Sequence, residues 1–182
     1  RGGRESRYIR AMKKHFQMFA AYNRWANERL YGAARALPDA EYRRPRGAFF
    51  GSLHGTLNHL LVTDRIWMRR FTGSGPMQTR LDEILFDGLD GLEGARKAED
   101  ERIFRYIDGL GDADLAGTFT YRTVTNPRDI TQPLAPALAH LFNHQTHHRG
   151  QAHGLVTAIA GNDAMPSLDL IAFQRISGMG MS

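Results

Sequence analysis

The chain has 182 residues, of which 42% are hydrophobic, so it can fill one core and is too short to demand a second domain. It contains no cysteine, which excludes disulfides, thiolate ligands and a cysteine nucleophile and leaves nitrogen and oxygen as donors for any metal ion. The net charge of +5 would permit nucleic-acid binding, but no basic run with interleaved aromatic residues supports such a partner. We therefore expect a single domain over residues 1–182.

The sequence also bears on location. No apolar run approaches the roughly 20 residues that span a membrane. The first ten residues lack the apolar stretch of a secretory signal. We expect a cytoplasmic protein with no membrane partner.

The first half of the chain predicts two long helices. Apolar residues recur at helical intervals over residues 8–37, and a proline ends the pattern. Residues 38–51 contain two prolines and two glycines and form a connector, with one short helical turn over 39–42. A second helix follows over residues 52–71, with Ser52 at its N-cap and a Gly-Ser-Gly-Pro stretch after its end.

The second half adds a small hairpin and two more helices. Residues 77–86 show no clear pattern, and a helix with one solvated face follows over residues 89–110. Threonines and aromatic residues after residue 117, followed by an Asn-Pro turn, predict a small β-hairpin. The last long helix covers residues 134–160 and ends at a glycine. These elements predict an all-α four-helix bundle, a fold whose interior often holds metal sites.

Four of the eight histidines lie within residues 140–148 of the last helix. Because each helical residue turns about 100°, His140, His144 and His148 form one row, and His147 lies beside it. Imidazole is a common ligand for zinc, nickel and related ions. Three pairings within the row can supply two ligands: His140 with His144, His144 with His148, or His144 with His147. Spacing does not decide among them.

A third ligand has to come from another element. The 52–71 helix carries His54 and His59, which lie about 140° apart around its axis and cannot both face the bundle centre. His59 is the better candidate because it lies mid-helix among leucines, where a neutral imidazole needs a partner for its ring nitrogens. A hydrogen-bonded core histidine is the alternative interpretation.

Four segments carry a recognisable family pattern, in family order and over most of the chain: Tyr22–Leu30, Gly47–Arg70, Phe119–Val124 and Leu138–Gln151. The last is the most specific, since it holds an HxxxHRGQ pattern after the expected hairpin. With these segments the chain resembles the DinB family of small bacterial proteins, part of a wider group of metalloenzymes that includes the YfiT-like proteins.

The resemblance implies up-down-down-up connectivity and a divalent ion held by His59, His144 and His148. On this basis His140 and His147 become neighbours of the site and not ligands. Zn and Ni are the favoured ions, with Fe, Co and Mn as further candidates. The resemblance also implies a homodimer.

Helix geometry suggests which other side chains surround the ion. Gln151 follows His148 by three residues and can face the same cavity, and Trp25 and Asn27 on the first helix can line it. Arg149 is interpreted as an exposed helix arginine, with anion binding as the alternative. No general base is evident, since Asp64 lies about 140° around the helix axis from the ligand His59.

Three protein ligands leave coordination positions for water or substrate, which is typical of a catalytic site. The resemblance points to thiol-dependent transferases, in which a low-molecular-weight thiol is the nucleophile. We therefore expect a metal-dependent enzyme that acts on a small molecule. A metal-dependent hydrolase and a non-catalytic, metal-stabilised bundle that binds a ligand or partner are the alternatives.

Overall fold

The computed structural model describes residues 2–124 and 126–181, so residues 1, 125 and 182 of the expected domain lie outside the described residues. Four long helices form most of it: α1 (Gly2–Arg35), α3 (Leu53–Thr72), α4 (Leu89–Gly109) and α6 (Leu134–Ala160). Short elements connect and follow them: α2 (Asp39–Arg43), α5 (Asp112–Ala116), β1 (Thr118–Arg122), β2 (Asp129–Pro133), the 3₁₀ turn η1 (Asn162–Ala164) and α7 (Leu170–Ser177). The predicted all-α class, with a small antiparallel hairpin before the last long helix, is confirmed.

Most helix ends agree with the predicted ends. The bounds of α3, α4 and α6 lie within one residue of the prediction, and α3 begins where the Ser52 hydroxyl accepts a hydrogen bond from the Gly55 amide at 3.1 Å. The structure differs for the first helix, which begins at Gly2 instead of residue 8 and ends at Arg35 instead of residue 37. The residues between Gly2 and residue 8 are polar, so they add no apolar position from which a helical period can be recognised.

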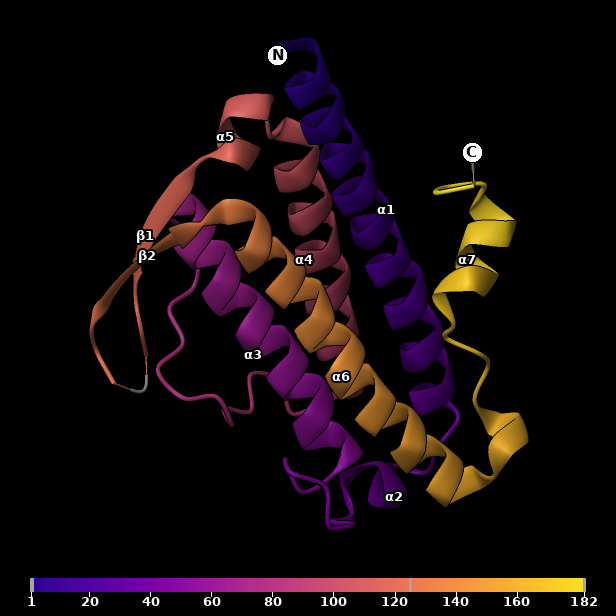
Figure 1. The fold of residues 1–182 in the computed structure, drawn as a ribbon. Helices are drawn as coiled ribbons and strands as arrows, with labels where there is room; N and C mark the ends of the chain where they lie inside the picture. Colours follow the sequence, from indigo (N-terminus) through magenta and orange to yellow (C-terminus); the bar gives the residue numbers. More distant parts are fainter. Residues whose placement is uncertain (1, 125, 182) are drawn as a thin grey trace.

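The order of the helices fixes one long connection. α1 and α6 run in one direction and α3 and α4 in the other, which is the up-down-down-up arrangement (Figure 1). Because α3 and α4 are parallel, residues 73–88 must return along the bundle before α4 can begin. This segment, here called the crossover, has no helix or strand and includes the stretch without pattern over residues 77–86.

A layer of buried polar side chains separates two apolar clusters in the bundle. One cluster contains Leu57, Leu61 and Leu92, and the other contains Phe16 and Leu138. The polar layer draws on all four long helices and consists of Asn23, Asn27, Asp64, Arg96, Asp100, Gln145 and Arg149.

Ion pairs and amide hydrogen bonds hold the polar layer together. The Arg96 guanidinium lies 2.7 Å from a carboxylate oxygen of Asp64 and 2.9 Å from one of Asp100. Asn23 donates to Asp100 at 2.9 Å, and Arg149 donates to the Asn23 side-chain oxygen. Buried charges are tolerated only when they are paired in this way. Rotating any one of the four helices about its axis would break these pairs, so the layer restrains the orientation of all four.

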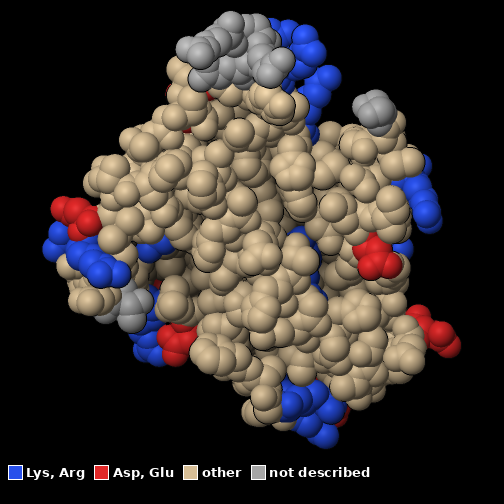
Figure 2. Space-filling model, viewed as in Figure 1, with Lys and Arg blue, Asp and Glu red and all other residues tan. Residues whose placement is uncertain are grey.

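The face built by α3 and α6 carries few charged side chains, and most Lys, Arg, Asp and Glu side chains in this view lie at its rim (Figure 2). The one charged residue of α6, Arg149, is buried in the polar layer. The hairpin packs Phe119 and Tyr121 against Trp67 and Phe71 at the end of α3.

Among the described residues, no helix combines the length and apolar character that crossing a membrane requires.

The polar layer makes a testable contribution to stability. Arg96→Met removes the cation that neutralises Asp64 and Asp100, so we expect the free energy of unfolding to fall by about 3–5 kcal/mol. Arg105→Met is the matched control, because Arg105 lies on the same helix with a side chain that is 77% exposed, and it should cost less than about 1 kcal/mol. Urea denaturation of both variants measures the difference, and equal losses would show that the layer adds nothing beyond a surface ion pair.

Candidate metal centre

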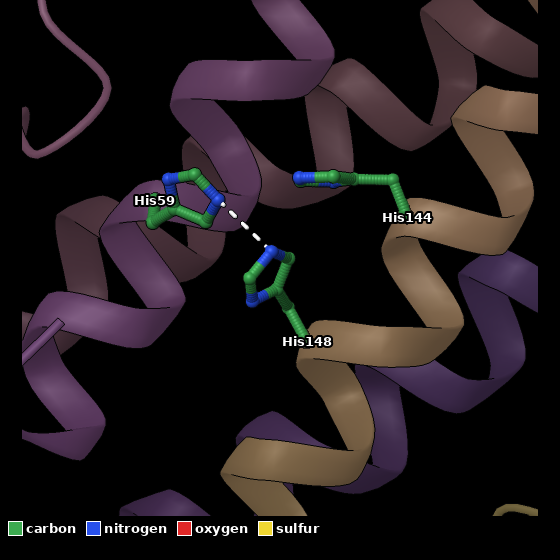
Figure 3. A group of neighbouring side chains, drawn as sticks. All are labelled: His59, His144 and His148. Carbon is green, nitrogen blue, oxygen red and sulfur yellow. Dashed lines mark hydrogen bonds between the residues drawn. The ribbon is translucent and has the colours of Figure 1, made fainter. Parts of the chain in front are cut away.

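Three histidines meet between α3 and α6. His59 projects from α3, and His144 and His148 project from consecutive turns of α6 toward it (Figure 3). One ring nitrogen from each residue can be chosen so that all three lie within 4.8 Å of one another. The structure thus brings together the residues implied by the family resemblance.

The packing of α3 on α6 sets this convergence. The spacing of four residues places the His144 and His148 rings 4.4 Å apart between centroids. The buried Gln145 side chain donates to the backbone carbonyl of Leu60 at 3.3 Å, which ties α6 to α3 next to the cluster. The same helix face therefore carries both the metal-ligand candidates and the contact that positions them.

The crossover fixes the tautomer of His59. The Nδ1 atom of His59 lies 2.7 Å from the backbone carbonyl oxygen of Leu81. A carbonyl can only accept, so Nδ1 must carry the proton and Nε2 must carry a lone pair when the ring is neutral. Asn58 holds the crossover in place, since its side-chain oxygen accepts from the backbone amides of Leu85 and Phe86 at 2.9 and 3.0 Å.

A side chain fixes the tautomer of His148. Its Nδ1 atom lies 2.7 Å from the Gln151 side-chain oxygen, which also can only accept. The Gln151 amide nitrogen lies 3.3 Å from the Nε2 atom of His147, a contact that keeps the amide in this orientation. Nε2 of His148 therefore carries a lone pair as well.

Two acceptor nitrogens consequently face each other. The Nε2 atoms of His59 and His148 are 3.3 Å apart, the contact drawn as a dashed line in Figure 3. With both protons held on Nδ1, neither nitrogen can donate a hydrogen bond to the other. The two lone pairs therefore repel each other unless a cation lies between them. Two nitrogens bound to one tetrahedral zinc ion at about 2.0–2.1 Å would be separated by about 3.3 Å. The observed separation fits that requirement.

A shared proton does not resolve the contact at neutral pH. Burial lowers the pKa of His59 to about 4 and that of His144 to about 3, and it also lowers the pKa of His148. The Nδ1 atom of His144 is buried and has no hydrogen-bond partner among the described residues. Three neutral, incompletely satisfied imidazoles are the donor set that a divalent ion requires.

An aromatic side chain that no sequence pattern singles out covers the cluster. The Phe50 ring stacks on His59 at 3.6 Å between centroids and meets His148 at 5.5 Å. Its position depends on Gly55, where an added Cβ would lie 2.1 Å from the Phe50 backbone oxygen. Position 55 must therefore be glycine for the loop to approach the helix this closely.

The remaining residues expected around the ion divide into two groups. Gln151 and His147 lie beside His148, as the contacts above show. Trp25 packs instead against Phe173 of α7 at 5.7 Å, and Asn27 donates to Asp100 within the polar layer at 3.0 Å. The structure therefore does not bring Trp25 and Asn27 to the histidine cluster, because α1 lies behind α6 with respect to the site.

Other predicted positions changed or gained a partner. Arg149 is not an exposed arginine, because it is 2% exposed and binds Asn23 and Gln145. His140 is exposed and packs on Trp67 at 5.0 Å. Asp64 is paired with Arg96 in the polar layer, and no carboxylate joins the cluster in the part of the chain that the structure describes.

The buried neutral histidines predict an acid-sensitive metal-free protein. Imidazoles titrate near 6.5 when unfolded, whereas His59 and His144 titrate near 4 and 3 when folded. Between these values the unfolded state binds more protons, so the free energy of unfolding should fall as the pH drops from about 6.5 to about 4. Urea denaturation in the presence of a chelator measures this dependence.

His144→Phe is the control for the acid effect. It removes one of the titrating groups, so its stability should fall less steeply over the same pH range. Burial raises the pKa of Asp64 to about 6, which gives the opposite slope, but it does so in both proteins and cancels in the difference. Identical slopes would mean that His144 is not protonated on unfolding in this range.

Comparisons with known proteins identify the family of the chain. The family model described as DinB family matches residues 12–167, a range that includes all three histidines. Protein DinB of Bacillus subtilis (strain 168) is 27% identical over 144 residues, which cover 71% of this chain and 77% of the relative. The chain therefore belongs to the DinB family.

Proposed function

We propose that His59, His144 and His148 bind one divalent metal ion and that the protein is a metal-dependent enzyme. The observation that carries the proposal is the pair of Nε2 lone pairs that face each other at 3.3 Å without a donor between them. Zn and Ni are the ions we favour, because neutral nitrogen donors suit both, and Fe, Co and Mn are further candidates.

The three proposed ligands carry no charge, which matters for the chemistry of the site. A divalent ion held by neutral imidazoles supplies Lewis acidity that lowers the pKa of a thiol or water, or polarises a carbonyl. The chain's own residues prepare this chemistry: Leu81 and Gln151 keep two ring protons on Nδ1, and Phe50 limits access of water to His59.

The reaction we favour is a thiol-dependent S-transfer to a small electrophile. The sulfur of a low-molecular-weight thiol forms the new S–C bond, its proton is lost, and the leaving group of the electrophile departs. Because the chain has no cysteine, the sulfur in this reaction must come from a cosubstrate. The pairing of two copies into a homodimer stays a prediction.

Metal binding is tested first. Protein purified without an affinity tag should contain close to one divalent ion per chain by elemental analysis. His144→Gln should weaken Zn binding by at least about a hundredfold, since it removes one of three ligands. His153→Gln, on the same helix, is the control and should bind Zn as the unaltered protein does. Equal affinities in the two variants would exclude His144 as a ligand.

Catalysis is tested separately from metal binding. Zn- or Ni-loaded protein is mixed with glutathione or cysteine and with 1-chloro-2,4-dinitrobenzene, and the absorbance of the S-aryl product is followed. We expect a rate at least about tenfold above that of the metal-free protein and of His144→Gln. Hydrolysis of a p-nitrophenyl ester without thiol transfer would instead indicate a metal-dependent hydrolase. If metal only raises the melting temperature and neither reaction is accelerated, the protein is a non-catalytic, metal-stabilised bundle.

A further inference from the structure

A cavity of about 490 Å³ lies between the end of α3, the crossover and the hairpin. Its wall contains apolar side chains such as Ile66 and Met77, several threonines and three arginines. None of the described residues that line it is acidic. Its volume is within the range of small-molecule sites.

Two of the three arginines bind other groups through their guanidinium, and the third has no such partner within the described residues. Arg69 donates to a backbone carbonyl of the crossover, and Arg122 pairs with Asp129 across the hairpin at 3.1 Å. Arg70 forms no ion pair or hydrogen bond with the residues that the structure describes, and its Nε is buried. An arginine without an anion is therefore part of the cavity wall.

Aromatic rings hold Arg70 in place. Its guanidinium carbon lies 4.4 Å from the Trp67 ring centroid and 4.5 Å from that of Tyr121. Burial lowers the pKa of Arg70, which reflects the cost of placing its charge here. Stacking fixes the plane of the guanidinium and leaves its donor edge for a planar anion such as a carboxylate.

A second polar group in the wall also lacks a partner. Gln78, in the crossover, is 7% exposed, and its side-chain oxygen is buried without a hydrogen bond within the described residues. A buried amide oxygen without a donor costs free energy, which a hydroxyl or N–H group of an occupant, and not its carboxylate, would recover. Within the described residues, the cavity wall therefore contains a guanidinium without an anion, that of Arg70, and an amide oxygen without a donor, that of Gln78.

The cavity and the histidine cluster lie next to the same face of α3. Arg70 follows His59 by 11 residues on α3, which is three helical turns, or about 16 Å, along the same face. Between them, His140 packs on Trp67 at 5.0 Å and lies 5.9 Å from the ring of His144. One crossover segment supplies Gln78 to the cavity and the Leu81 carbonyl to His59.

We propose that the cavity binds the carboxylate of the small molecule that reacts at the histidine cluster, with Arg70 as its charged partner. The reacting end of this molecule rests on the proposed function, whereas binding of the carboxylate by Arg70 does not need the metal. The two parts can therefore be tested independently.

The first experiment tests the anion site in metal-free protein. Trp25→Phe leaves Trp67 as the single tryptophan, and because Arg70 stacks on Trp67, an anion bound at Arg70 should change its fluorescence. We expect a saturable response to sodium hexanoate and none to hexanol at constant ionic strength. A response to both, or to neither, overturns the proposal.

Variants in the same background assign the response to Arg70. Arg70→Met should weaken hexanoate binding by at least about tenfold, and the exposed Arg105→Met should leave it unchanged. Equal binding in the two variants overturns the proposal. If Arg70→Met does not fold, the comparison of hexanoate with hexanol still decides the question, because it needs no change at Arg70.

The second experiment tests the link between the cavity and the cluster. Calorimetry on Zn-loaded protein compares 3-mercaptopropionate, 8-mercaptooctanoate and 11-mercaptoundecanoate with mercaptoalcohols of the same lengths. A molecule that reaches both places gains affinity, because its second contact is intramolecular. We expect no gain for the shortest carboxylate and a gain of at least about tenfold for the longest, lost in Arg70→Met.

The outcomes separate the two proposals. Equal affinities of acids and alcohols at every length would show that no molecule bound at the cluster also contacts Arg70, and this result would overturn the inference. A protein that binds no metal defeats the proposed function, while the hexanoate titration still decides whether Arg70 binds a carboxylate.

Discussion

The parallel course of α3 and α4 is the constraint on which the rest of the structure depends. A short turn cannot join two parallel helices, so the crossover has to return along the bundle beside α3 (Figure 1). Asn58 binds this segment through the backbone of Leu85 and Phe86. The position of the crossover then determines both the tautomer of His59 and one wall of the arginine-lined cavity. The segment that the topology of the bundle requires thus also supplies groups to the candidate site.

Ionisable side chains of the bundle have three different kinds of surroundings. In the polar layer, Arg96 is neutralised by Asp64 and Asp100 at hydrogen-bonding distance. At the histidine cluster, burial lowers the pKa values of His59 and His144 far enough to keep both imidazoles neutral at pH 7. At the cavity, half-buried Arg70 stacks on Trp67 and Tyr121 and forms no ion pair within the described residues. Since unpaired buried charge is unfavourable, the ion pairs of the polar layer are needed for the fold itself, whereas the partners of the other two places are the metal ion and the carboxylate that we propose.

Much of the fold was accessible from the sequence because it depends on local patterns. Apolar periodicity and the Ser52 cap located the long helices, and threonine-rich, aromatic residues located the hairpin. The pairing of His144 with His148 followed from the family resemblance, since spacing alone left three choices. What the sequence could not supply was long-range: the burial of Arg149, the stacking of Phe50 on His59 and the distance of Trp25 from the cluster each depend on how separate elements pack. α7, against which Trp25 packs, was not anticipated, because its apolar residues form too short a run to show a period.

The hydrogen bond between His59 and Leu81 has a consequence for how such a site is inherited. The acceptor is a main-chain oxygen, so any residue at position 81 can provide it, and the Leu81 side chain itself is 42% exposed. Substitutions there leave the imidazole tautomer intact, whereas an insertion or deletion between Leu81 and the anchored Leu85 would shift the carbonyl away from the ring. The orientation of this histidine therefore depends on the length of a loop and on the side chain of Asn58 that anchors it, and not on the identity of the residue whose carbonyl contacts the ring.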